Sequence, residues 1–256
     1  MKKSLLSAAI VAGIVALPAT AFGQVLTSEN FNYVGALTNN GWTAHSGAGN
    51  RVIMADGAVA TLTQAGGSGE DVNRSFPALG ATDKIYAAFD LLVNTADLSV
   101  LDPNGLYLAH FKDAEFAFRG RVGIVQPFAG RGWSLAINAD SSALGAGATW
   151  PRELDFETWY RVVISWDAGT GESRLWVDPT FETSPSAVHI GTATGDLIES
   201  FVLRQSNAFT GTQMIDNVFV GRSFNDVVIP APASLVLFAM AGLTGLGGLA
   251  RRRSER

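Results

Sequence analysis

Three carboxylates stand at alternate positions in one short segment of the chain. The segment ELDFE reads Glu153, Leu154, Asp155, Phe156 and Glu157. On a β-strand successive side chains point to opposite faces, so the three acids would share one face and the two apolar residues the other. Two carboxyl groups about 5–5.5 Å apart across a sugar ring are the nucleophile and the acid/base of a retaining glycosidase. ELDFE therefore offers glycoside hydrolysis as a chemistry, provided that it forms a strand.

The neighbouring residues favour a loop instead. A single residue separates ELDFE from the strand expected at 159–166. A strand through ELDFE would continue without a turn to more than twice the usual length of about 5–6 residues. Upstream, the Gly- and Ala-rich stretch 143–148 and Pro151 are typical of a loop. We expect ELDFE to end this loop, with Leu154 or Phe156 beneath the sheet and the acids in solvent.

The body of the chain is acidic. The 256 residues carry a formal net charge of −5, and residues 24–226 alone hold 12 Lys and Arg against 22 Asp and Glu, a net of −10. Phosphates repel such a body, so nucleic acid and anionic membrane surfaces are excluded as partner classes. The sequence has no cysteine, which excludes disulfides and thiolate metal sites.

Short runs rich in β-branched and aromatic residues, separated by Gly, Asp, Asn, Ser and Pro, predict many short strands. We expect them at 51–55, 58–63, 85–93, 107–111, 121–125, 133–138, 159–166, 173–178, 187–191, 201–204 and 214–220. No interior segment sustains a helical period over three turns. The predicted fold class is all-β, a two-sheet jelly-roll sandwich over residues 24–226.

One stretch is more specific. WYRVVISWDAGTGESRLWVDP, residues 159–179, resembles the hairpin of laminin-G-like, concanavalin A-like sandwiches, in which a Trp-Tyr pair opens one strand and a Val-Asp pair ends its partner. SENFNYVGAL (28–37) and IDNVFVGRSF (215–224) resemble the first and last strands of the same sandwiches. The resemblance implies a concanavalin A-like jelly roll, with Trp159 as a hydrophobic anchor of the hairpin. It identifies a fold rather than an activity.

Laminarinases and lichenases share this fold, and ELDFE is similar to their catalytic strand, Glu-aliphatic-Asp-apolar-Glu. That resemblance implies Glu153 as nucleophile, Asp155 as the residue that positions it, and Glu157 as acid/base. In those hydrolases further strands separate the catalytic strand from the Trp-containing hairpin, and here there is no room for them. We therefore expect no catalytic residue and keep the endoglycanase as the alternative.

Such sandwiches often bind a structural calcium where the first and last strands meet. The resemblance makes Glu29 and Asp216 candidate ligands, since Ca²⁺ prefers carboxylate and carbonyl oxygens. The alternative is a solvent-facing acid and a strand-end hydrogen bond. We expect no other cofactor.

The remaining histidines and aromatic residues are less informative. The histidines are far apart and lack the spacing of a zinc site. Four tryptophans could stack on sugar rings or pack in the core, and the sequence does not separate the two. These residues are His45, His110 and His189, and Trp42, Trp133, Trp150 and Trp176.

Residues 1–23 follow the three-part plan of a secretory signal peptide. Two lysines precede an apolar run, 5–17, which is followed by Pro18 and small residues. We expect cleavage before Gln24, with cleavage before Phe22 as the alternative. The sequence therefore predicts export.

The segment 227–256 predicts a membrane anchor. A proline motif, Pro230, Ala231 and Pro232, precedes the apolar stretch 233–250, and Arg251, Arg252 and Arg253 follow it. At about 1.5 Å per residue this stretch would extend roughly 27 Å as a helix, enough for a bilayer core. The arginines belong on the cytoplasmic side, which places the sandwich outside it.

This tail resembles the PEP-CTERM sorting signal of Gram-negative bacteria, which combines a short proline motif, one transmembrane helix and a terminal basic cluster. The resemblance covers about the last thirty residues and implies processing by an exosortase, usually in organisms that make exopolysaccharide. Ala231 replaces the family's central Glu. The protein is thus expected to be membrane-anchored and then located at the cell surface or outside the cell.

Three functions follow from these patterns. The first is a non-enzymatic cell-envelope or matrix protein whose sandwich binds extracellular polysaccharide. The alternatives are a laminarinase-like endoglycanase that uses ELDFE and an adhesion module that binds protein.

Overall fold

The computed structural model describes residues 24–64, 67, 69–95, 98, 101–206 and 211–228. The expected signal peptide (1–23), proline motif (230–232), apolar helix (233–250) and basic cluster (251–253) lie outside the described residues. Among the residues that are described, no helix has the length and apolar character needed to cross a membrane.

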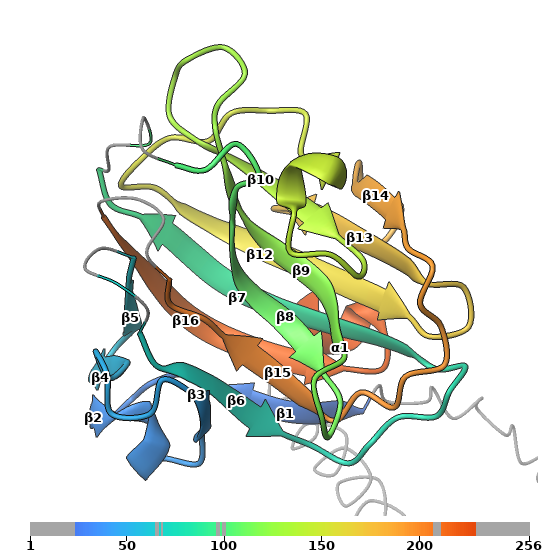
Figure 1. Cartoon of the computed structure of the whole chain (residues 1–256), viewed down its shortest axis with the longest axis horizontal. Coiled ribbons are helices and arrows are strands. Elements are labelled where there is room, and N and C mark those ends of the chain that lie inside the picture. The colour runs from blue at the N-terminus through green and yellow to red at the C-terminus, as the bar shows by residue number, and fades with distance from the viewer. Residues whose placement is uncertain are drawn as a thin grey trace, which may run out of the picture.

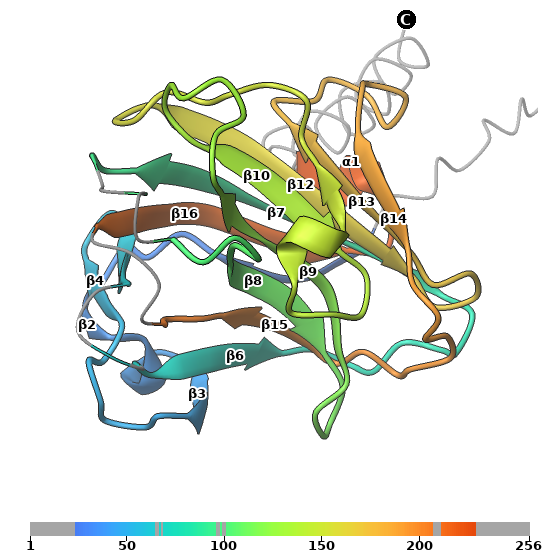
Figure 2. The same cartoon turned by 45° about the horizontal axis from the view of Figure 1, so that its top comes forward.

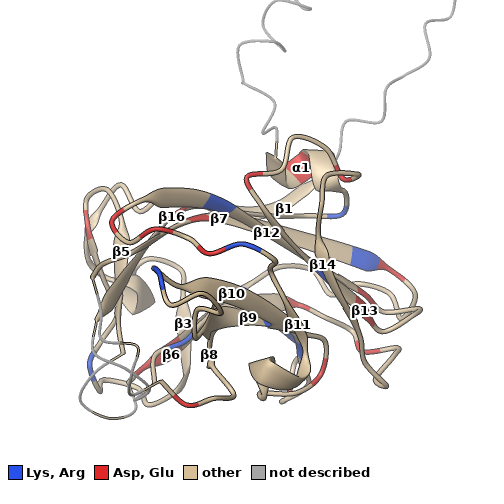
Figure 3. Ribbon diagram, turned by 90° about the horizontal axis from the view of Figure 1, so that it is seen from above, with Lys and Arg blue, Asp and Glu red and all other residues tan. Residues whose placement is uncertain are grey.

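Two antiparallel β-sheets pack face to face around a shared core, and Figure 3 shows them as two layers. We call one the back sheet. Its strands are, in order, β14 (Ala187–Ile190), β13 (Glu172–Val177), β12 (Trp159–Asp167), β7 (Lys84–Val93), β16 (Thr212–Gly221), β5 (Ala60–Thr63), β4 (Met54–Asp56) and β2 (Val34–Ala36), and β1 (Val25–Glu29) also pairs with β16.

The other layer, the front sheet, lies over the first (Figure 1). Its strands are, in order, β11 (Ala148–Thr149), β10 (Ser134–Asn138), β9 (Phe118–Val125), β8 (Leu106–Lys112), β15 (Ser200–Leu203), β6 (Asp71–Ser75) and β3 (Thr43–Ser46). Two short 3-10 turns, Leu37–Asn39 and Leu144–Ala146, and one helix, α1 (Phe224–Val228), complete the described elements. The fold is thus the predicted all-β sandwich of two antiparallel sheets.

Alternation along the strands builds the core. On β12, Val162, Ile164 and Trp166 point into the space between the sheets, whereas Val163 points to the outer face of the back sheet. The buried apolar faces of the two sheets stabilise the sandwich mainly by removing this surface from water.

The four tryptophans left open by the sequence are all buried and pack in the protein interior, and Trp150 also lines the pocket described below. The indole of Trp133 donates to the backbone carbonyl of Asp155 at 3.1 Å, and that of Trp176 donates to the carbonyl of Glu182 at 3.1 Å. The two other buried tryptophans are Trp42 and Trp150.

Trp159 was expected to be a buried anchor of the β12–β13 hairpin, and this expectation is wrong. Its side chain is 43% exposed, because it is the first residue of β12 and points to the outer side of the sheet. The neighbouring Tyr160 packs against the core instead, with its ring 6.1 Å from that of Trp133.

Every expected strand has a counterpart, although some ends shift by up to three residues, as for 51–55 against Met54–Asp56. Three strands, β3, β6 and β11, were not expected, and the first strand, expected within residues 28–37, is instead two strands, β1 and β2. β6 reads DVNRS and buries only Val72 in the core, so its sequence is too polar to predict a strand. β6 forms because it pairs with β15 on one side and with β3 on the other.

The folded unit extends beyond the expected boundary at residue 226. Phe224 and Val227 of α1 are buried against Tyr86 and Trp176 on the outer face of the back sheet. The sandwich therefore includes the chain as far as Val228, where the described residues end.

Candidate ligand-binding site

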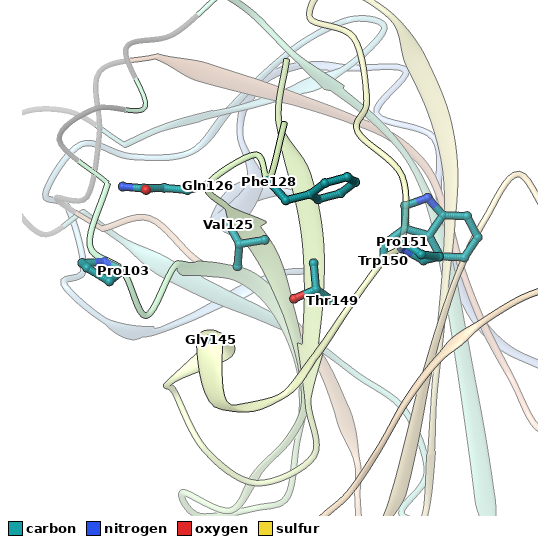
Figure 4. A pocket seen from close by; sticks show the side chains of 8 residues that line it. All are labelled: Pro103, Val125, Gln126, Phe128, Gly145, Thr149, Trp150 and Pro151. Atoms are coloured by element: carbon teal, nitrogen blue, oxygen red, sulfur yellow. The ribbon is translucent and has the colours of Figure 1, made fainter. Parts of the chain in front are cut away.

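A pocket of about 460 Å³ lies at one end of the front sheet (Figure 4). Three segments surround it: the loop before β8, the β9–β10 hairpin, and the segment that leads through β11 to ELDFE. The lining residues are Pro103, Val125, Gln126, Phe128, Gly145, Thr149, Trp150 and Pro151.

The β9–β10 hairpin carries the most exposed aromatic ring of the pocket. Phe128 is 64% exposed, although burial is the usual state of such a ring. The hairpin is held close to ELDFE, because Gly132 has φ +59° and a side chain there would lie 2.0 Å from the carbonyl oxygen of Leu154. Only glycine permits this approach.

Glu153 fixes the conformation of this hairpin. Its carboxylate accepts hydrogen bonds from the backbone N–H groups of Ala129 and Arg131, which lie on either side of Gly130. Next to it, the buried Leu154 forms an isolated antiparallel bridge with Trp133, with reciprocal N–H to carbonyl bonds of 3.0 and 2.7 Å. The first half of ELDFE thus supports the loop that presents Phe128.

The other two acids of ELDFE point elsewhere. Glu157 accepts hydrogen bonds from the backbone N–H and the hydroxyl of Thr95, at 2.6 and 3.2 Å, and it adopts a left-handed conformation with φ +57°. Asp155 is exposed. ELDFE is a loop, as expected, so it does not provide the strand with three carboxylates on one face that the endoglycanase alternative requires.

Backbone contacts hold the opposite walls of the pocket together. The side-chain amide of Gln126 donates to the carbonyl of Leu101 at 3.0 Å, and the N–H of Gly145 donates to the carbonyl of Asn104 at 3.1 Å. A side chain at Gly145 would lie 2.9 Å from the carbonyl oxygen of Pro103. Contacts within the chain therefore hold the walls of the pocket in place.

The lining suits a ligand with both apolar faces and hydroxyl groups. The ring of Phe128 and the Trp150–Pro151 pair offer apolar surface, and the Thr149 hydroxyl can donate and accept hydrogen bonds. A sugar ring has this combination of C–H faces and hydroxyls.

The two candidate calcium ligands do not come together. Glu29 pairs with Val218 and shares its core-facing side, where its carboxylate accepts 2.6 Å and 3.3 Å bonds from Arg74 and the indole of Trp42. Asp216 stands opposite Asp90 on the outer face of the back sheet, because an irregularity in β16 follows it. The expected calcium site at Glu29 and Asp216 is therefore wrong.

No group of three or more His, Asp or Glu side chains that could hold a metal ion occurs within the described ranges. His189 accepts the backbone N–H of Ala139 through Nδ1 at 3.1 Å. His45 and His110 lie together on the front sheet, with ring centroids 6.4 Å apart.

Comparison with known proteins identifies the fold alone. No protein family and no curated protein match the sequence. Among solved structures, a sialidase is 14% identical with a TM-score of 0.52, over 80% of this chain and 19% of that one. The carbohydrate esterase vb_24B_21 of Shiga toxin-encoding bacteriophage phi24B is 13% identical with a TM-score of 0.52, over 78% and 99%.

The CBM2 module of an evolved Dit protein from Lactobacillus casei BL23 phage J-1 is 12% identical with a TM-score of 0.50, over 78% of this chain and 96% of that module. The chain thus spans about a fifth of the sialidase but nearly the whole of the other two. Enzymes and a binding module share this sandwich, so the likeness shows the fold and does not decide between binding and cleavage.

Glu153 was a candidate site residue from the sequence, but the pocket residues around it were not. Phe128 and Gln126 lie in the stretch QPFAGRG between two predicted strands. An aromatic residue inside a Gly-rich hairpin loop is a signal that could have identified them, because such loops lie on the surface and present side chains to ligands.

Proposed function

We propose that the sandwich is a non-catalytic glycan-binding domain whose ligand enters the pocket of Phe128 and Trp150. The observation that carries this proposal is Phe128, a largely exposed aromatic ring on a hairpin that Glu153 and Gly132 hold in a fixed position. A rigid ring that is exposed beside a preformed pocket suits stacking against the apolar face of a sugar.

Two further observations support the proposal. The names of the similar solved structures concern carbohydrates, which supports a glycan ligand, and one of them is a CBM2 module. Glu153 and Glu157, which the endoglycanase alternative needs on one strand face with Asp155, instead accept backbone N–H groups from two separate loops.

The experiment compares two equally exposed phenylalanines. Full-length protein in a neutral detergent is applied to an array of laminarin, mixed-linkage glucan, agarose, carrageenan and polygalacturonate. Phe128→Ala should lower the affinity for the retained glycan at least tenfold with an unchanged melting temperature. Phe181→Ala, 67% exposed beyond β13, is the control and should bind as the wild type does.

Equal binding by both variants, or retention of no glycan, would reject the proposal. Capture of a protein partner together with the absence of glycan binding would favour the adhesion alternative. Release of shortened glycan by the wild type that is lost in Glu153→Gln would restore the endoglycanase.

We also propose that the protein is exported and anchored by an exosortase-type sorting signal. The support is the sequence pattern alone: the proline motif, the apolar stretch and the arginines of 230–253. Deleting residues 230–256 should move the protein from the membrane fraction to the soluble one. A truncated protein that stays in the pellet after a carbonate wash would contradict the anchor.

A further inference from the structure

The outer face of the front sheet carries two arginines around one tyrosine. The guanidinium carbon of Arg204 lies 4.1 Å from the ring centroid of Tyr107, and that of Arg121 lies 5.4 Å from it. Arg121 lies on β9, Tyr107 lies on β8, and Arg204 directly follows β15. We call these three residues the arginine–tyrosine cluster.

Two donor atoms of Arg121 in this cluster lack acceptors. Its Nε and Nη1 atoms are buried, and neither has a hydrogen-bond partner in the described part of the chain. A guanidinium can only donate hydrogen bonds, and an unpaired buried donor costs about 1–3 kcal/mol. The group that would complete the site must therefore bring acceptor oxygens.

A fully buried histidine lies beside the cluster. The ring of His110 is 5.5 Å from that of Tyr107 and 4.5 Å from that of Phe118, and neither of its nitrogens has a partner among the described residues. Burial, followed by the charge of Arg121, keeps the pKa of His110 well below its ordinary value, so the ring is neutral. His110 thus adds polar atoms without cancelling the positive charge of the arginines.

The cluster is cationic although the sandwich as a whole is acidic. Arg204 has one nearby carboxylate, Asp71, at 3.8 Å, and it also donates to the carbonyl of Tyr107 at 3.4 Å. Lys112 is the last residue of β8. Its ammonium donates to the backbone carbonyl of Asp113, a neutral acceptor that does not cancel its positive charge. Such a cationic patch would attract an anion to an otherwise repelling surface.

The cluster adjoins the proposed pocket. Tyr107 packs against Val125, Ala136 and Leu144, and Val125 also lines the pocket. Figure 1 places the turns at the two ends of β9 at opposite ends of the front sheet. One turn carries Phe128 and the other carries Phe116, which is 75% exposed. A chain-like ligand along β9 would pass over the cluster.

We propose that the arginine–tyrosine cluster binds the carboxylate or sulfate groups of an acidic polysaccharide whose neighbouring sugar occupies the pocket. This inference rests on the proposed function and names the class of its ligand. Carboxylates and sulfates accept charge-assisted hydrogen bonds from a guanidinium, and the unpaired Nε and Nη1 of Arg121 can each donate one.

The test uses pairs of related glycans of which one member is acidic and the other neutral. Isothermal titration calorimetry of the full-length protein compares polygalacturonate with its methyl ester, and carrageenan with agarose. Inorganic sulfate is the third probe. We expect at least a tenfold preference for the acidic member of one pair and no saturable binding of sulfate.

Three variants locate the preference. Arg121→Met and Arg204→Gln should each remove most of it, whereas Phe128→Ala should weaken both members of the pair by the same factor. Arg222→Gln, which removes one charge near the back sheet, is the control and should keep the preference.

The outcomes separate the two proposals. Equal binding of acidic and neutral members overturns this inference but supports the pocket. Binding of neither member overturns both proposals. Saturable binding of sulfate without a preference between glycans would show a site for free anions and would also overturn the inference.

Discussion

The outer faces of the two sheets each carry an arginine beside an aromatic ring, but only one of these arginines is satisfied. Arg161 on the back sheet lies 5.5 Å from the ring centroid of Phe219 and donates to Asp90, to the carbonyl of Asn217 and to the carbonyl of Val227, at 3.0, 2.7 and 2.8 Å. Arg121 on the front sheet has a similar ring contact and unpaired donors. Burial lowers the pKa of both arginines.

The difference arises from what covers each face. On the back sheet, α1 supplies both apolar cover and a carbonyl acceptor, so its arginine is part of the fold. On the front sheet, the described part of the chain provides no acceptor for Nε and Nη1 of Arg121. Arg161 is therefore a structural residue, because the protein completes its hydrogen bonds. Arg121 is a candidate for ligand recognition, because two of its donors are left without acceptors.

The largest expected effect concerns the apolar cover of the back sheet. Trp176 is buried with its ring 5.4 Å from that of Phe224 in α1, so Trp176→Ala should lower the free energy of unfolding by about 3–5 kcal/mol. Urea denaturation measures it. Trp159→Ala on the same hairpin removes an exposed ring and should cost less than about 1 kcal/mol. Equal losses of unfolding free energy in the two variants would mean that burial of Trp176 beneath α1 adds no stability.

The next effect concerns the satisfied arginine. Arg161→Met leaves Asp90 without its cation and the carbonyl of Val227 without a donor, and it should lower the free energy of unfolding by about 3 kcal/mol. The same urea titration measures this. A loss below about 1 kcal/mol would show that these contacts contribute little and would weaken the contrast between the two faces.

The matched change on the front sheet should be far milder. Arg121→Met removes unpaired donors and keeps the apolar stem, so the free energy of unfolding should stay within about 1 kcal/mol or rise. Chemical denaturation in the absence of glycan and of multivalent anions measures it. A loss as large as that of Arg161→Met would identify Arg121 as a structural residue.

The smallest expected effect is a pH dependence of the free energy of unfolding, caused by Asp216 on the back sheet. Burial, and secondarily the charge of Asp90, raises the pKa of Asp216. The folded chain then binds more protons than the unfolded one, so the free energy of unfolding falls as pH rises from the ordinary carboxyl value of about 3.9 through the raised value.

Asp216→Asn should remove part of this decline, by less than about 1 kcal/mol because the carboxyl is partly exposed. Urea titrations at steps between pH 4 and pH 7 measure it, with Asp155→Asn as a control at an exposed acid. A steeper decline in Asp216→Asn than in the wild type would contradict the assignment.

The sandwich was predictable where apolar residues alternate, and not where pairing alone forms a strand. β12 and β13 were evident because hydrophobic side chains recur in them at a period of two. β6 was not, because its neighbours on both sides, rather than its own side chains, specify its conformation.

The candidate site was less predictable for a related reason. Glu153 was noticed for its spacing, but its role depends on the two N–H groups of a hairpin that is more than twenty residues away. Tyr107, Arg121 and Arg204 meet only because β9, β8 and β15 are neighbours in the front sheet. The local sequence of each strand cannot predict this proximity, because strand order is a property of the whole chain.

The pairing of β1 with β16 also determines how the domain is presented. Val25 pairs with Gly221, only a few residues before Val228, so the chain enters and leaves the sandwich at neighbouring points. β1 lies in the layer of the back sheet and α1 packs on the outer face of that sheet, away from the front sheet (Figure 3), and Figure 2 shows α1 from another direction. A sandwich held by either end would therefore turn its arginine–tyrosine cluster away from whatever holds it, toward the surrounding medium.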